Sequence, residues 1–156
     1  MTVTARKVLG DLEVATRLLR QELTSDQLRV LWVAGVALCR AIGHALAQVD
    51  SKSSPELKLA ISNRFALWEA DRETHRIFFE FIKGERDAVL KEYEFGFLAG
   101  AEALGNISIP EDMKQVLPDN FFCPISEGCF AGVDACDVLD TSERWWRRQL
   151  DEIDSA

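Results

Sequence analysis

The sequence predicts an all-α fold: an up-and-down bundle of four long helices, followed by a long irregular segment and a C-terminal helix. Apolar residues recur at spacings of three and four over most of the chain. Glycine and proline gather between about residues 96 and 133. The 156 residues are 47% hydrophobic and 28% charged. That is enough for a single domain, residues 1–156, with a buried core.

The first two helices are expected over residues 4–23 and 26–49. The second helix is apolar on nearly every side, which is typical of a helix at the centre of a bundle. Arg40 and His44 interrupt its apolar stretch from Val30 to Val49. We therefore expect a buried core helix rather than a membrane span, and no membrane partner.

The third and fourth helices are expected over residues 55–70 and about 74–95. Ser54 supplies a capping hydroxyl and Pro55 suits the first helical position. The fourth element is rich in isoleucine and phenylalanine and contains Gly84, at a cost of about 1 kcal/mol relative to alanine. Both helices are expected to turn their large apolar side chains toward the core.

The irregular segment, about residues 96–133, is expected to be ordered and to pack on the bundle. It carries isoleucine and phenylalanine among its glycines and prolines, unlike a disordered linker. The final helix is expected from about residue 134 to 153, with Trp146 on its inner face.

Charge is distributed unevenly along the chain. The net charge is −8; residues 1–78 carry 11 basic and 9 acidic side chains, and residues 79–156 carry 7 and 17. Non-specific nucleic-acid binding needs clustered lysine and arginine, so this balance argues against it. The acidic half instead favours solubility or a protein partner with a basic surface.

The four cysteines and the N-terminus indicate the compartment. The last three cysteines follow a C-x5-C-x6-C pattern, which lacks the close pairs of structural zinc sites. We expect free thiols, no metal and no other cofactor. The N-terminal residues show no secretory signal. Together these features predict a cytoplasmic protein.

One group of candidate site residues is a polar network around the second helix. Arg40 and His44 are four residues apart and therefore share a helix face. Charged groups on apolar faces are usually paired, and Glu85 is the leading candidate partner. The network is either a buried ion pair that fixes helix register or a basic pair that lines a pocket or dimer groove.

The second group lies within residues 85–93. Arg86, Asp87, Lys91 and Tyr93 resemble the motif of HEPN domains, in which an arginine, commonly followed by Asn or Asp, precedes a histidine and often a tyrosine. The resemblance implies a small all-α bundle that is often dimeric. In active members the arginine and histidine of two subunits meet at the dimer interface and cleave RNA without metal.

Lys91 stands where such a family has histidine. Acid–base catalysis near neutral pH favours a group with a pKa near 7, which an exposed lysine does not supply. Arg40 with His44 is the other candidate pair, although one residue short of the family spacing. The resemblance therefore implies a degenerate member, and the simpler alternative is that Glu85, Arg86, Asp87 and Lys91 form the charged side of an amphipathic helix.

We expect a non-catalytic protein-interaction or regulatory module that works as a homodimer. The alternative is a metal-independent ribonuclease of the HEPN type, which would use Arg86 and Lys91, with Tyr93, or Arg40 and His44. Only this alternative makes RNA a ligand. A third class, a metal-binding bundle, would depend on the acidic residues around His75.

Overall fold

The computed structural model has helices, turns and irregular segments, and no strand is assigned among the residues it describes. The all-α class is therefore confirmed. The described residues are 1–85, 89, 93–105 and 108–156.

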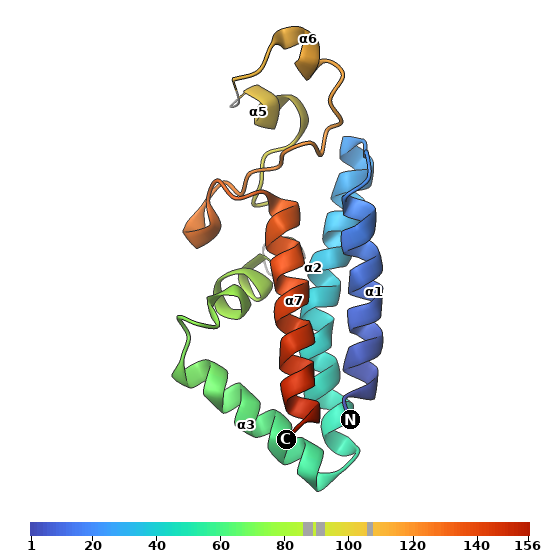
Figure 1. Ribbon diagram of the computed structural model, residues 1–156, viewed down its shortest axis with the longest axis vertical. Coiled ribbons are helices and arrows are strands. Elements are labelled where there is room, and N and C mark those ends of the chain that lie inside the picture. The colour runs from blue at the N-terminus through green and yellow to red at the C-terminus, as the bar shows by residue number, and fades with distance from the viewer. Residues whose placement is uncertain (86–88, 90–92, 106–107) are drawn as a thin grey trace.

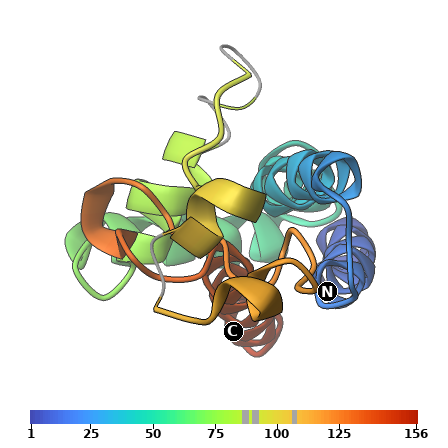
Figure 2. The ribbon, with the colours of Figure 1, turned by 90° about the horizontal axis from the view of Figure 1, so that it is seen from above.

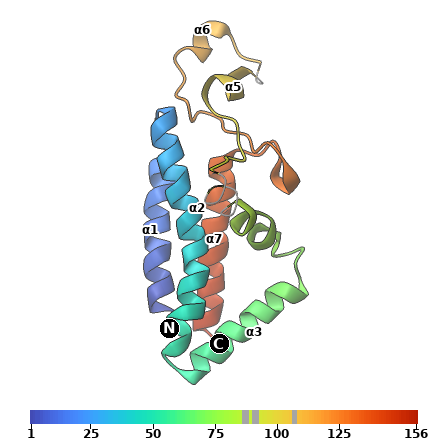
Figure 3. The same cartoon turned by 180° about the vertical axis from the view of Figure 1, so that it is seen from behind.

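Three long helices lie side by side and form the body of the molecule (Figure 1). α1 (Val3–Leu19) and α2 (Ser25–Gln48) form an antiparallel hairpin, and α7 (Ala135–Asp154) packs against both. Seen from above, the hairpin lies on one side of α7 and the segment around α3 (Pro55–Ala70) on the other (Figure 2). α3 diverges from the three long helices toward its C-terminal end (Figure 3). Residues 135–154 thus join the hairpin, while α3 leans away from it.

Local sequence explains where three of these helices begin. Thr24 caps α2 in a reciprocal capping box with Gln27. The Ser54 hydroxyl accepts a backbone N–H in the first turn of α3, and Pro55 follows at the first helical position. The Asp134 carboxylate accepts two backbone N–H groups at the start of α7. These caps place the starts close to where the sequence predicts them.

The N-terminus of α1 is held by residues distant in sequence. Asp50, which is buried in the 3-10 turn η1 (Asp50–Lys52), accepts the backbone N–H groups of Thr4 and Ala5 at 3.0 and 2.9 Å. The backbone N–H and hydroxyl of Thr2 donate to the carboxylate of Asp154 at 2.6 and 3.0 Å. The two ends of the chain therefore lie together at one end of the bundle (Figure 1).

Arginines join α1 to α7 along their whole length. Each surface ion pair contributes little alone, but their positions fix the antiparallel register of the two helices. The pairs are Arg6 with Asp151 and Asp154, Arg147 with Glu13 and Glu143, and Arg20 with Asp137 and Asp140.

Two glycines let α7 approach α2 closely. A Cβ atom on Gly35 would lie 2.6 Å from Cδ2 of Leu139, and one on Gly43 would lie 3.3 Å from the ring of Trp146. Leu139 and Trp146 are fully buried, as the sequence predicts. These contacts form the centre of the hydrophobic core.

An aromatic cluster joins the α3 side of the molecule to α7. The ring of Trp68 lies 4.8 Å from that of Trp145 and 5.8 Å from that of Trp146. Phe78, in the π-helix η2 (Ile77–Ile82), stacks on Trp145 with a 5.3 Å centroid distance. Because α3 diverges, these large rings fill the space that close helix packing would otherwise remove.

Two polar side chains are built into this cluster. Gln149 is 2% exposed, and its Oε1 accepts from Nε1 of Trp68 at 2.7 Å and from Nε of Arg64 at 2.8 Å. Nδ1 of His75 accepts from Nε1 of Trp145 at 3.1 Å. Burial, assisted by the positive charge of Arg64, lowers the pKa of His75 below its ordinary value.

The expected long helix over residues 74–95 is wrong. Residues 71–75 form turns, η2 follows, and residues 93–95 are not helical. Bulky side chains at consecutive positions, including Phe78 and Phe81, reach the core from a wider π turn. The irregular run over 96–133 contains two short helices, α5 (Gly100–Gly105) and α6 (Glu111–Lys114), and the 3-10 turn η3 (Gly128–Phe130).

The 96–133 segment extends beyond one end of the bundle and is tied back to it (Figure 1). Isolated antiparallel bridges join Phe97 to Ile125 and Pro124 to Asp134. The carboxylate of Asp119 accepts from the backbone N–H and hydroxyl of Ser25 at 2.7 and 2.6 Å.

α2 together with η1 is the described helix long and apolar enough, by length and composition, to cross a membrane. Within this chain, 44% of its most apolar window is buried, and α1 and α7 cover one side. Its packing is that of a core helix, although its outer face is less covered than the sequence predicts.

Candidate functional site

The outer face of α2 carries apolar side chains that the chain itself does not fully cover. Val30 is 65% exposed. Val33, Ala34, Ala37 and Ala41 are half-buried and follow Val30 at helical spacing. The expected central helix, covered on all sides, is therefore wrong: one side of α2 faces the core and the other faces outward.

An apolar groove adjoins this face at the α1–α2 turn. It has a cavity volume of about 450 Å³, and Leu18, Leu23, Val30 and Leu31 supply its apolar walls. Asp26 stands at its polar edge, where it pairs with Arg29. The groove and the outer face of α2 share Val30 and so form one continuous surface.

Arg40 and His44 lie on the same outward side of α2, toward its C-terminal end. His44 is exposed and Arg40 is half-buried. No ion pair or hydrogen bond joins either residue to another described residue. Both are therefore available at the surface, which matches the alternative of a basic pair at a groove more closely than a buried ion pair.

Glu85 contacts other groups than the expected cations. Its Oε1 accepts from Nε1 of Trp32 at 3.2 Å and from the backbone N–H of Gly96 at 3.2 Å. Among the described residues, no ion pair joins Glu85 to Arg40 or His44. Glu85 instead anchors the start of the 96–133 segment to the buried indole of Trp32.

The HEPN-like motif is only partly described. Arg86, Asp87 and Lys91 lie outside the described residues. Tyr93 is 62% exposed, has a positive φ of 55°, and packs its ring 5.1 Å from that of Phe95. Hydrogen bonds from Asp26 and Tyr93 raise the pKa of Arg29, which brings Tyr93 close to the N-terminal part of α2.

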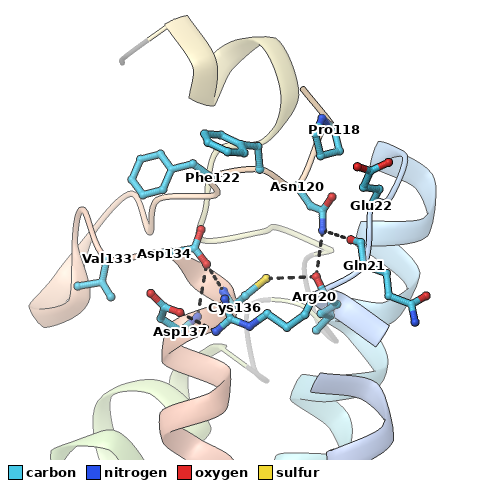
Figure 4. A pocket seen from close by; sticks show the side chains of 12 residues that line it. Arg20, Gln21, Glu22, Pro118, Asn120, Phe122, Val133, Asp134, Cys136 and Asp137 are labelled. Atoms are coloured by element: carbon cyan, nitrogen blue, oxygen red, sulfur yellow. Dashed lines mark hydrogen bonds and ion pairs between the residues drawn. The ribbon is translucent and has the colours of Figure 1, made fainter. Parts of the chain in front are cut away.

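A second hollow lies where the C-terminus of α1 meets the N-terminus of α7 (Figure 4). Its cavity volume is about 560 Å³. Arg20 crosses its floor to reach Asp137 at 2.6 Å. Nδ2 of Asn120 donates to the backbone carbonyls of Leu19 and Gln21 at 2.9 and 2.7 Å.

The polar groups of this hollow satisfy one another rather than face a ligand. Asp134 accepts the backbone N–H groups of Cys123 and Cys136 at 2.8 and 2.9 Å. Burial raises the pKa of the Cys136 thiol to about 12, so it is not a thiolate nucleophile at neutral pH. Histidine is absent from the residues that line it. The hollow is a joint that holds the 96–133 segment against the helix ends.

Sequence reasoning missed Gln149, Asn120 and the outward apolar face. Gln149 sits between two inner-face positions, Trp146 and Leu150, and its place in that stripe was the available signal. Asn120 gave no local signal, since it caps backbone carbonyls about a hundred residues away.

Over the described ranges, no group of three or more His, Cys, Asp or Glu side chains is arranged to hold a metal ion. Cys39, Cys123 and Cys136 are buried free thiols, and Cys129 is an exposed one. Comparison with protein-family models, with curated proteins and with solved structures finds no match to this chain.

Proposed function

We propose that this protein is a non-catalytic, cytoplasmic interaction module that works as a homodimer through the outer face of α2. One observation carries the proposal: α2 is apolar on nearly all sides, yet α1 and α7 cover only one of them. Exposed apolar surface rimmed by polar groups marks protein–protein interfaces. The continuous surface from the groove to Ala41 fits that description.

The non-catalytic part of the proposal is supported by where the titratable groups lie. His44 is the exposed histidine, and no described carboxylate is paired with it or with Arg40. His75 accepts a hydrogen bond within the aromatic cluster, which is a packing role. Four free thiols, one of them exposed, support a reducing compartment.

Oligomeric state tests the proposal directly. Sedimentation equilibrium over micromolar concentrations is expected to give a dimer. Val30→Glu is expected to give a monomer with unchanged circular dichroism, because a charge would be buried at the interface. Leu59→Glu is the matched control, since Leu59 is 61% exposed on α3, away from the α2 face. A monomeric wild-type protein would overturn the proposal, as would a dimer insensitive to Val30→Glu.

The acidic second half supports a protein partner with a basic surface. Glu111 and Asp112 are exposed on α6, in the segment that extends beyond the bundle (Figure 1). Binding of a lysine-rich probe peptide is expected to weaken with added salt and in Glu111→Gln/Asp112→Asn. Equal binding by the variant would contradict this part of the proposal.

One observation favours the alternative, a metal-independent ribonuclease of a degenerate HEPN-like kind. An exposed imidazole lies one helical turn from a guanidinium, at His44 and Arg40, on the face proposed to meet a second copy. RNA incubated with the protein in EDTA separates the two proposals. Cleavage that is lost in folded His44→Ala and Arg40→Ala variants would favour the nuclease; intact RNA supports the interaction module.

A further inference from the structure

We infer that two copies of this chain pack α2 against α2 in an antiparallel pair, about a two-fold axis between Ala34 and Ala37. This inference depends on the proposed self-association and specifies its geometry. The partner is a second copy because the face is complementary to itself in both shape and charge. A face of this kind forms an isologous interface.

Shape sets the register of the pair. Along the outward face, Val30, Ala34, Ala37 and Ala41 follow one another at spacings of four, three and four. An antiparallel pair centred between Ala34 and Ala37 places Val30 opposite Ala41 of the second copy. The most exposed side chain of the face thus meets a small one. Alanines at the crossing let the helix axes approach to about 8 Å.

The groove beside Val30 extends the interface. In this register, the level of Gln27 in one copy faces the level of His44 in the other. The groove has apolar walls from Leu18 and Leu23 and a carboxylate at its edge from Asp26. An imidazole has an apolar body and a polar edge, so His44 of the second copy suits both features.

Charge selects the antiparallel direction over the parallel one. Asp26 lies near the N-terminal end of α2, and Arg40 and His44 lie toward the C-terminal end. Antiparallel pairing brings Asp26 of each copy near His44 of the other. Parallel pairing would set Asp26 against Asp26 and Arg40 against Arg40, and like charges at an interface are unfavourable.

The register separates this interface from a shared catalytic centre. With a helical rise of 1.5 Å per residue, the two His44 side chains lie about 26 Å apart along the axis. The two imidazoles therefore stand at opposite ends of the interface, where neither can reach the other's arginine.

Spin-label distances test the direction and register. In a Cys129→Ser background, Gln48→Cys carries a nitroxide at an exposed position at the end of α2. Pulsed electron resonance is expected to give a distance of about 40 Å for the antiparallel pair, against roughly 10–20 Å for a parallel one. A matched label at Gln27→Cys is expected at about 27 Å.

Variants of the end contacts give a second readout. Asp26→Asn and His44→Gln are each expected to weaken dimerisation by roughly 2- to 30-fold, since each dimer holds two such exposed contacts. The double variant is expected to lose no more than either single one. A dimer with other distances, or with additive effects, would overturn the inference and leave the proposed homodimer standing. A monomer would remove both.

Discussion

Replacing Gln149 with methionine tests the account of the α3–α7 junction. Methionine keeps the length of the side chain but removes the oxygen that accepts from Trp68 and Arg64. Trp68 is fully buried, so its N–H would lose its only described acceptor, at a cost of about 1–3 kcal/mol. The bond from the half-exposed Arg64 adds about 0.5–1 kcal/mol, because water can replace it there.

The expected loss in the free energy of unfolding is therefore about 2–4 kcal/mol. For a domain of this size, that lowers Tm by roughly 5–15 °C. Urea unfolding followed by tryptophan fluorescence measures it. Arg64→Met is the matched control, since it leaves the Trp68–Gln149 bond intact and is expected to cost less than about 1 kcal/mol. A loss below about 0.5 kcal/mol in Gln149→Met would refute the assigned role of this side chain.

Three further predictions concern pH, packing and thiols. The pKa of His75 is lower in the folded protein, so stability is greatest above its unfolded pKa of about 6.5 and falls as pH drops through that value; His75→Gln should flatten this part of a Tm-against-pH curve, and an unchanged slope would count against it. Gly35→Ala should destabilise by about 1 kcal/mol through Leu139, whereas Gly10→Ala, with open space around it, should stabilise by up to about 1 kcal/mol in urea melts. A thiol reagent should label one cysteine per native chain, Cys129; more than one fast thiol would contradict the burial of the rest.

The long helices could be predicted because their signals are local. α2 begins at Ser25 and ends at Gln48, within one residue of the range expected from its periodicity and from the turn before Asp26. α1 ends at Leu19, short of residue 23, because Asn120 binds the carbonyls at its C-terminus. No residue near Leu19 in sequence carries that information.

The element over residues 74–95 failed for a different reason. Its apolar residues are dense enough to satisfy an α-helical stripe, yet the same side chains also satisfy a π turn that points Phe78 toward Trp145. Which turn forms depends on α7, almost seventy residues away. Tertiary contacts then override the local pattern.

The candidate site depended on partners that a sequence does not specify. Glu85 is one helical turn from apolar neighbours, so a cation on α2 was the natural expectation. The indole N–H of Trp32 meets the carboxylate instead. Likewise, the apolar residues of α2 show how greasy the helix is, but only the positions of α1 and α7 show that Val30 faces outward.

The contact between Thr2 and Asp154 brings the first and last turns of the chain within hydrogen-bonding distance. A short peptide linker could bridge them, so a circular permutant reopened at the exposed tip around Gly128 should retain the same core. Fusion partners added to either terminus would emerge from the same pole, leaving the α5–α6 extension unobstructed at the opposite pole.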